Sequence, residues 1–342
     1  MAIKKKSFEF KDVKKKFSKE ATFKADRFFD LGDAFLDAAG IPGPAMGHLN
    51  MFLGHTDTGK TTALLKTAAD AQKKGILPVI IITEQKWSFD HAQLMGLDCE
   101  KVVDEETGEM TWDGFFLFNN EFQYIEQITD YINDLLDAQK KGDLPYPLVF
   151  LWDSVGSVPC KMTYDGKGGK QHNASVLSDK IGMGLNQRIT GSRRVESEYT
   201  NTLIVVNQPW VELPDNPFGQ PKIKAKGGES IWLNSTLVFL FGNQKNAGTT
   251  KIKITKNKRA INIASRTKVT VMKNHVNGIA YADGRIMVTP HGFFKAKDTA
   301  EEKKSREEYV RDHIDYIGTI FGEKITDVAE VQFVETSSED ED

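Results

Sequence analysis

The sequence predicts an α/β fold in which a mostly parallel, twisted sheet is flanked by helices. Four short apolar runs, at 49–53, 77–83, 148–152 and 203–206, have the composition of strands, and stretches of helical periodicity separate them. Such alternation favours a parallel sheet, whose strands are buried on both faces and are therefore apolar throughout. The first run also leads into a glycine-rich loop at 54–62 that precedes a helix, an order typical of nucleotide-binding sheets.

Composition favours a soluble protein built around one large domain. The chain has 342 residues, of which 39% are hydrophobic and 27% charged, and its formal net charge is -3. Cys99 and Cys160 form no CxxC pair, which indicates a reducing compartment and no disulfide or cysteine–metal site. No apolar run approaches the ~20 residues that span a bilayer, and the N-terminus lacks the apolar core of a signal peptide. We therefore expect a cytoplasmic protein without membrane contact, in the host cytoplasm if the source is viral.

The glycine-rich loop matches the phosphate-binding pattern Gly-x4-Gly-Lys-Thr. Glycines let backbone N–H groups turn toward a phosphate chain, Lys60 reaches the β- and γ-phosphates, and the Thr61 hydroxyl ligates Mg²⁺. The alternative is a glycine-rich turn before an ordinary helix, but the flanking strand and helix favour nucleotide binding. The predicted nucleotide contacts in this loop are Gly54, His55, Thr56, Asp57, Thr58, Gly59, Lys60, Thr61 and Thr62.

Two carboxylates follow predicted strands, where a parallel sheet places its ligand crevice. Glu84 comes after the second apolar run, so we expect it to orient or polarise a water near the γ-phosphate; a helix N-cap or a surface salt bridge is the alternative. Asp153 ends the third apolar run, an arrangement called Walker B, whose carboxylate supports the Mg²⁺ shell. Together with the phosphate-binding loop, these carboxylates indicate an NTPase.

Basic residues gather in three places. Residues 1–30 are rich in lysine, with Phe8, Phe10 and Phe17 interleaved; they form either a solvated arm or one that docks on a neighbouring subunit or a phosphate backbone. From Ser230 to Ala282 there is no Asp or Glu, which indicates a polyanion site or an acidic partner, with solvated hairpin surface as the alternative. Two glycine-containing loops, which we expect to be irregular, leave neighbouring strands, and they and the helix between them carry the remaining candidates: Lys161, Lys167, Lys170, Arg188, Lys222, Lys224, Lys226, Gly227 and Gly228.

These residues resemble the RecA family of strand-exchange recombinases, including its phage UvsX-type members. Four segments carry the resemblance in the order that the family has: residues 151–155 resemble its Walker B strand, residues 202–208 the strand that ends in a nucleotide-sensing glutamine, Gly227-Gly228 with Ser235 the end of the second DNA loop, and residues 268–274 the strand that presents a lysine to the ATP of the adjacent subunit. The matches cover roughly residues 28–280, and their conjunction is more specific than any one of them.

The resemblance implies a domain plan. Residues 1–30 would form a basic arm and candidate polymerisation element, and residues 31–285 a RecA-like P-loop ATPase core with two DNA-binding loops and a C-terminal part rich in β-hairpins. Residues 286–342 would form a small helical region with an acidic, disordered tail. The two DNA-binding loops would lie at about 157–172 and 209–230, separated by a helix at roughly 174–198.

The resemblance also implies roles for single residues. Gln208 would report the γ-phosphate to the second DNA loop, and catalysis would rest on Glu84, Lys60 and Gln208. His91 falls where the family usually stacks an aromatic ring on adenine, and Lys273 where it reaches the neighbouring ATP. The implied cofactors are ATP and Mg²⁺. His275 departs from the family, since bacterial members have a second intersubunit lysine there.

The function that the resemblance implies is that of a DNA-dependent ATPase. Such a recombinase forms helical filaments on single-stranded DNA and promotes homologous pairing and strand exchange with duplex DNA, in recombination, repair and replication. Single-strand-binding and mediator proteins are candidate partners. The alternatives are a hexameric RecA-fold DNA helicase, a non-catalytic ATP-gated DNA-binding or mediator protein, and a small-molecule kinase, which would leave the basic loops unexplained.

Overall fold

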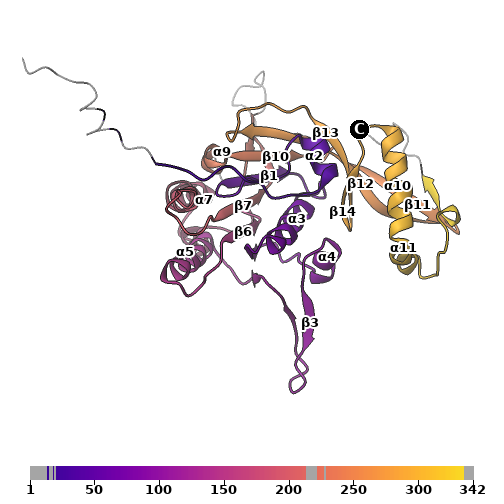
Figure 1. Ribbon diagram of the computed structural model, residues 1–342, viewed down its shortest axis with the longest axis horizontal. Helices are drawn as coiled ribbons and strands as arrows, with labels where there is room; N and C mark the ends of the chain where they lie inside the picture. The colour runs from indigo at the N-terminus through magenta and orange to yellow at the C-terminus, as the bar shows by residue number, and fades with distance from the viewer. Residues whose placement is uncertain (1–13, 15–17, 19–20, 213–221, 227–228, 335–342) are drawn as a thin grey trace, which may run out of the picture.

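The computed structural model describes Lys14, Ser18 and residues 21–212, 222–226 and 229–334. Its centre is an 11-stranded mixed sheet flanked by helices (Figure 1). Nine of these strands follow the order β14-β13-β12-β10-β1-β7-β6-β2-β5, while β11 pairs with β12 and β15. This architecture confirms the predicted α/β class with a mostly parallel sheet at its core and hairpins in its C-terminal part.

The parallel half of the sheet holds the strands predicted from the apolar runs. All pairs among these strands are parallel. The strands are β1 (Leu49–Gly54), β2 (Leu77–Ile82), β5 (Leu117–Asn119), β6 (Leu148–Asp153), β7 (Thr202–Asn207) and β10 (Leu237–Phe241). Because side chains alternate between faces, Phe52 of β1 packs in one hydrophobic cluster, and Met51 and Leu53 pack in the opposite one.

Helices cover both faces of the parallel strands. The cluster around Phe52 includes α2 (Asp33–Ala39), α3 (Lys60–Lys73) and α4 (Phe89–Leu94), whereas α5 (Ile125–Lys141) packs on the other face. The loop before α3 turns at Gly59, whose φ of 102° lies in the left-handed region that favours glycine. This turn directs the N-terminus of α3 toward the carboxyl edge of the sheet.

The antiparallel half extends the sheet beyond β10. Its strands are β11 (Thr250–Lys256), β12 (Arg259–Asn274), β13 (Gly284–Thr289), β14 (Gly292–Lys295) and β15 (Gln332–Val334). β12 is long enough to pair with β10 through its last residues and with β11 through its first. A third hydrophobic cluster joins these strands to α10 (Thr299–Asp312), α11 (Ile314–Phe321) and a 3₁₀ turn at Val328–Glu330. The helical region expected within residues 286–342 thus consists of two helices that meet at His313.

The helix expected over 174–198 is also divided. It comprises α7 (Lys170–Leu177), a π-helix, η1 (Ser178–Leu185), and α8 (Asn186–Gly191). The π-helix packs against α9 (Glu229–Asn234), and a Cβ at Gly182 would lie 2.5 Å from the Ser230 side-chain oxygen. Only glycine permits this approach, so a local packing contact accompanies the change in helical pitch.

The two loops predicted to be irregular are more regular than expected. The first contains α6 (Lys161–Tyr164) and the start of α7. The described ends of the second form an antiparallel pair, β8 (Pro209–Glu212) with β9 (Lys222–Ala225). Gly227 and Gly228 lie outside the described residues, as do the acidic tail from residue 335 and the arm before residue 21, except for Lys14 and Ser18.

One hairpin projects from the body of the molecule, at the bottom of Figure 1. It consists of β3 (Glu100–Val103) and β4 (Met110–Asp113), with Thr107 and Gly108 in its turn. The Asp104 carboxylate accepts hydrogen bonds from the backbone N–H groups of Glu106 and Thr107. Within the described part of the chain, no helix is both long and apolar enough to cross a membrane.

Candidate nucleotide-binding site

Four parallel strands deliver the predicted catalytic residues to one cavity. β1 leads to Lys60 and Thr61, β2 to Glu84, β6 to Asp153 and β7 to Gln208. All five residues line a cavity of about 130 Å³ at the carboxyl edge of the sheet. The structure therefore brings together residues separated by almost 150 positions in the sequence, as parallel pairing of their strands requires.

The residues suited to phosphate and Mg²⁺ are in contact. The Thr61 hydroxyl donates a 3.0 Å hydrogen bond to Asp153, and the Lys60 ammonium donates a 2.5 Å bond to the His55 carbonyl within the phosphate-binding loop. Burial lowers the pKa of Lys60, although Asp153 and Glu84 act against this shift. Burial likewise raises the pKa of Asp153, so a cation beside this carboxylate would offset the cost of its charge.

This donor set fits a hard divalent cation bound through phosphate. One carboxylate and one hydroxyl are few protein ligands, and no group of three or more metal-ligating side chains occurs among the described residues. Mg²⁺ commonly takes one or two protein oxygens and completes its shell with water and phosphate oxygens. Asp153 and Thr61 are therefore the residues that would hold it.

Glu84 is positioned by a residue that the sequence analysis did not single out. The Ser154 hydroxyl donates a 2.5 Å hydrogen bond to the Glu84 carboxylate, and the Lys86 ammonium lies 3.9 Å from its other oxygen. Ser154 is buried and follows Asp153 directly, so β6 fixes both side chains. Its place after the Walker B aspartate was the only sequence signal for this contact.

Gln208 is tied to the second basic loop. The Lys226 ammonium donates a 2.6 Å hydrogen bond to the Gln208 side-chain oxygen, and the Lys226 N–H donates to the Gln208 carbonyl at 3.0 Å. Asn207 adds a third bond, from its side-chain amide to the Lys226 carbonyl at 2.9 Å. Lys226, a predicted DNA contact, thus connects this loop to the catalytic cavity.

A second cavity, of about 420 Å³, continues from the start of α3. His91 lines it from α4, residues 262–265 from β12, and residues 288–290 from the end of β13 and the turn after it. Burial lowers the pKa of His91, which favours the neutral imidazole. A neutral ring in a cavity that Ile263, Ala264, Val288 and Pro290 also line suits a planar base, and this cavity shares Lys60 and Thr61 with the phosphate cavity.

Comparison with known proteins agrees with this geometry. No family model matches the chain. Protein RecA of Helicobacter acinonychis is 27% identical over 242 residues, which cover 67% of this chain and 61% of the relative. Protein RecA of Helicobacter pylori strain HPAG1 is 27% identical over 274 residues, which cover 74% of this chain and 70% of the relative. Protein RecA of Wolinella succinogenes is 25% identical over 240 residues, which cover 67% of this chain and 60% of the relative.

The chain is therefore similar to RecA proteins over 67–74% of its length. The matched region spans about three fifths of the length of the first of these relatives. The sheet, the phosphate-binding loop and the strand that ends at Asp153 are consistent with a RecA-like core. The likeness to UvsX-type members stays a prediction.

The remaining predicted nucleotide contact, Lys273, lies away from the site. It pairs with Val238 near the start of β10, whereas the phosphate-binding loop follows the end of the parallel strand β1. Its ammonium donates hydrogen bonds to the Trp232 and Leu233 carbonyls, at 2.9 and 2.8 Å. Lys273 is thus at the opposite edge of the sheet from the phosphate cavity of its own chain.

The predicted DNA contacts are dispersed. The Lys161 ammonium, in α6, lies 3.6 Å from the carboxylate of Asp165, which follows that helix; Lys167 is exposed, and Lys170 begins α7. Arg188 is not brought together with them, because its guanidinium bonds Asp137 and Asn133 of α5. Lys222 and Lys224 belong to β9.

The basic stretch from 230 to 282 is partly neutralised by acids from outside it. Arg266 lies 3.3 Å from Glu302, Lys256 lies 2.7 Å from Glu330, and Lys268 pairs with Asp283. A polar cavity of about 390 Å³ remains beside these strands, lined by Asn243, Asn246, residues 247–250, Arg266, Thr267, Lys268 and Arg285. The charged residues of this lining, Arg266, Lys268 and Arg285, are all basic, although Arg266 and Lys268 are paired with Glu302 and Asp283.

Proposed function

We propose that this protein is an ATP-dependent DNA recombinase that assembles into a filament on single-stranded DNA. In this proposal it hydrolyses ATP in response to DNA and promotes pairing and strand exchange with a homologous duplex, in recombination and repair. The position of Lys273 carries the proposal. Because Lys273 lies at the opposite edge of the sheet from its own phosphate cavity, a contact from this lysine to ATP would be to a nucleotide bound by another protomer.

Repetition of that contact favours a filament. A protomer that offers a nucleotide at one edge and a lysine at the other makes head-to-tail contacts, which build a helix when the rotation does not close. ATP would then lie at each interface, with Lys60 and Thr61 from one protomer and Lys273 from the next. A ring-forming helicase would use the same contacts with a rotation that closes, so imaging must separate the two.

ATP hydrolysis would use the cavity as follows. Mg²⁺ supplies charge neutralisation to the phosphates when bound, and Asp153 and Thr61 would hold it. Lys60 would contact the β- and γ-phosphates, and α3 would present its N-terminus to them. Glu84, held by Ser154, would orient a water for in-line attack and accept its proton.

The contact between Gln208 and Lys226 supports coupling of the nucleotide to DNA. Gln208 lines the phosphate cavity, and Lys226 belongs to the loop predicted to hold DNA. A γ-phosphate that attracts either side chain would alter their 2.6 Å hydrogen bond and thereby the loop. ATP binding would favour the DNA-gripping state, and hydrolysis would release it.

Backbone phosphates would supply most of the DNA affinity. The basic residues of the two loops would give sequence-independent, salt-sensitive binding, with Arg188 as the least supported contact, since its charge is already paired. The cavity lined by Arg266, Lys268 and Arg285 is a further basic surface, but Arg266 and Lys268 are paired with carboxylates, as Arg188 is.

The deciding experiment measures ATP hydrolysis with and without single-stranded DNA, at two salt concentrations. Wild-type protein is compared with Lys60→Ala and Glu84→Gln. Strong stimulation by DNA that both substitutions abolish supports the proposal, and electron microscopy of the DNA complex then distinguishes filaments from rings. Hydrolysis that is indifferent to DNA would refute it. Function that survives Glu84→Gln would favour an ATP-gated binding protein instead.

A further inference from the structure

The phosphate cavity is lined by a second lysine, Lys86. The charged residues among the described positions that line this cavity are Lys60, Lys86, Asp57, Glu84 and Asp153. Lys60 is buried and bonds a carbonyl of the phosphate-binding loop, whereas the Lys86 side chain is 75% exposed. Of the two cations at this cavity, Lys86 is therefore the one whose side chain can reorient.

The backbone on both sides of Lys86 is anchored. Directly before it, Gln85 has a φ of 55°, in the left-handed region, so the chain turns sharply there. Directly after it, the Trp87 ring packs against Phe89 and Phe118, with ring centroids 5.6 and 5.5 Å away. The Lys86 side chain thus starts from a fixed point beside the cavity, and its own rotations decide where the ammonium lies.

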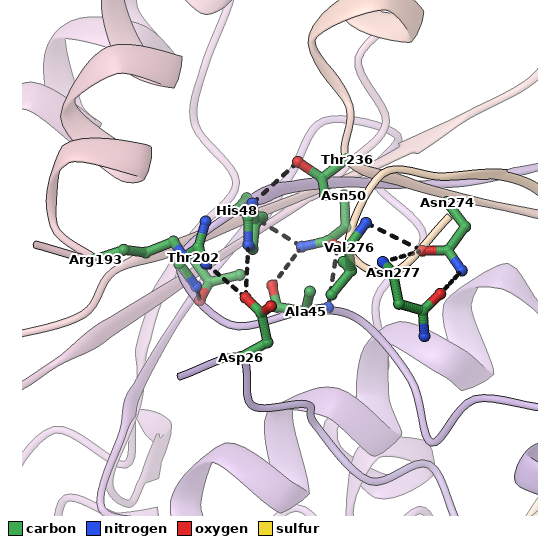
Figure 2. Close-up of polar contacts among 11 residues, drawn as sticks. Asp26, Ala45, His48, Asn50, Arg193, Thr202, Thr236, Asn274, Val276 and Asn277 are labelled. Carbon is green, nitrogen blue, oxygen red and sulfur yellow. Dashed lines mark hydrogen bonds and ion pairs between the residues drawn. The ribbon is translucent and has the colours of Figure 1, made fainter. Parts of the chain in front are cut away.

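The contact between Lys86 and Glu84 is a loose ion pair. Their charged atoms are 3.9 Å apart, which is beyond hydrogen-bond distance. Near the start of β1, by contrast, Arg193 bonds Asp26 at 2.5 Å, and the Arg193 side chain is only 19% exposed (Figure 2). An exposed pair without a hydrogen bond contributes little stability, so a phosphate group can displace it.

Lys86 lies close to the expected position of the γ-phosphate. In the proposed hydrolysis one water bridges Glu84 and the phosphorus, which separates the two groups by about two hydrogen-bond lengths, roughly 6 Å. An ammonium 3.9 Å from the carboxylate can cross that interval by side-chain rotation. The charge of Lys86 also reaches the cation side of the cavity, since burial raises the pKa of Asp153 and Lys60 and Lys86 oppose this shift.

Phosphoryl transfer requires positive charge at this place. Negative charge is spread over the γ-phosphate oxygens in the transition state, and lysine or arginine side chains commonly neutralise it together with Mg²⁺. We propose that Lys86 pairs with Glu84 in the nucleotide-free protein and turns to the γ-phosphate when ATP binds. Lys86 is then a second phosphate-binding lysine, supplied by the same chain as Lys60, and its departure leaves Glu84 free to orient the water.

Nucleotide binding in the absence of DNA tests the inference. The Glu84→Gln variant is the background, because it holds ATP without turnover and removes the charge with which Lys86 pairs. Displacement of a fluorescent ADP analogue, with Mg²⁺ present, gives the affinities for ATP and for ADP. Lys86→Ala and Lys86→Arg are each added to this background. The matched control is Lys304→Ala: the Lys304 side chain is 76% exposed, and its ammonium lies 3.6 Å from Glu308.

We expect Lys86→Ala to weaken ATP binding about tenfold and to leave ADP binding within about twofold of the background, because ADP lacks the phosphate that the lysine contacts. Lys86→Arg should keep most of the affinity for ATP, and Lys304→Ala should change neither affinity. An equal loss for both nucleotides would reduce Lys86 to a general attractor of anions. Unchanged ATP binding would leave it a surface partner of Glu84. Either result overturns the inference.

Hydrolysis with Glu84 in place gives a second measurement of opposite sign for the two roles. Lys86→Ala should lower kcat about tenfold or more if the lysine stabilises the transition state. A higher kcat would show that Lys86 only restrains Glu84, and it too would overturn the inference. The inference rests on the proposed ATP hydrolysis, but its binding test contains no DNA. Hydrolysis that is indifferent to DNA would therefore refute the recombinase and leave the selectivity of Lys86 for ATP over ADP intact.

Discussion

The hydrogen bond from Ser154 to Glu84 yields the sharpest prediction about catalysis. Ser154→Ala removes a 2.5 Å bond to the carboxylate that we propose as the water-orienting base. A bond to a charged group contributes about 1.5–3 kcal/mol, and because the Glu84 side chain is 27% exposed, the lower end applies. That energy corresponds to about a tenfold fall in kcat, against about 10²–10⁴ for loss of the base in Glu84→Gln.

The assay is steady-state ATP hydrolysis at saturating ATP and single-stranded DNA, with ATP affinity measured separately. We expect Ser154→Ala to lower kcat and leave affinity unchanged, because Ser154 acts through Glu84. Ser157→Ala is the matched control: its hydroxyl donates to the Ser154 carbonyl at 2.7 Å and contacts Thr83, but not Glu84. The prediction fails if the Ser154→Ala variant keeps the wild-type kcat, or if kcat falls as much in the Ser157→Ala variant.

Three further predictions concern the cation, the base and the interface. Burial raises the folded-state pKa of Asp153, so nucleotide-free protein binds that proton more tightly than the unfolded chain and loses stability as pH rises through the ordinary carboxyl range. The Asp153→Asn variant should therefore have a higher melting temperature than the wild type at neutral pH and a similar one in acid, and Mg-ATP should not stabilise it. A lower melting temperature than that of the wild type at neutral pH would contradict this. His91→Ala should weaken ATP binding by about two- to tenfold, whereas His91→Tyr should equal or exceed wild type, as displacement of a fluorescent ATP analogue can measure. An equimolar mixture of Lys60→Ala and Lys273→Ala should regain about a quarter of wild-type hydrolysis, because about one interface in four keeps both lysines; a mixture as inactive as its components would argue against a shared site.

The core and the phosphate site were predictable because short-range patterns encode them. Apolar runs of strand length marked the parallel strands, and the positions directly after them marked Glu84 and Asp153, since parallel strands align their carboxyl ends. Gly54–Thr62 needed no tertiary information either, because consecutive residues form the loop.

The rest depends on contacts between distant segments. Lys226 was predicted to contact DNA, yet its ammonium bonds Gln208, 18 positions away. The stretch from Ser230 to Ala282 carries only basic charges in the sequence, but in the fold Glu302 and Glu330 of the C-terminal region pair with two of them. The π-helix coincides with the contact of Gly182 with α9, which no periodicity signals. These features follow from packing, and a single sequence carries no direct measure of it.

The length of β12 links two nucleotides in the proposed filament. Residues 262–265 near its start line the base cavity of their own protomer, and Lys273 near its end would reach the phosphates bound by the neighbour. These points are roughly 30 Å apart along one strand, at about 3.4 Å per residue. Because β12 is hydrogen-bonded to β10, β11 and β13, a displacement at one end of the strand would be transmitted to the other end. Each β12 strand would then couple the ATP site of its own protomer to that of the neighbour, and hydrolysis would be correlated between neighbouring protomers.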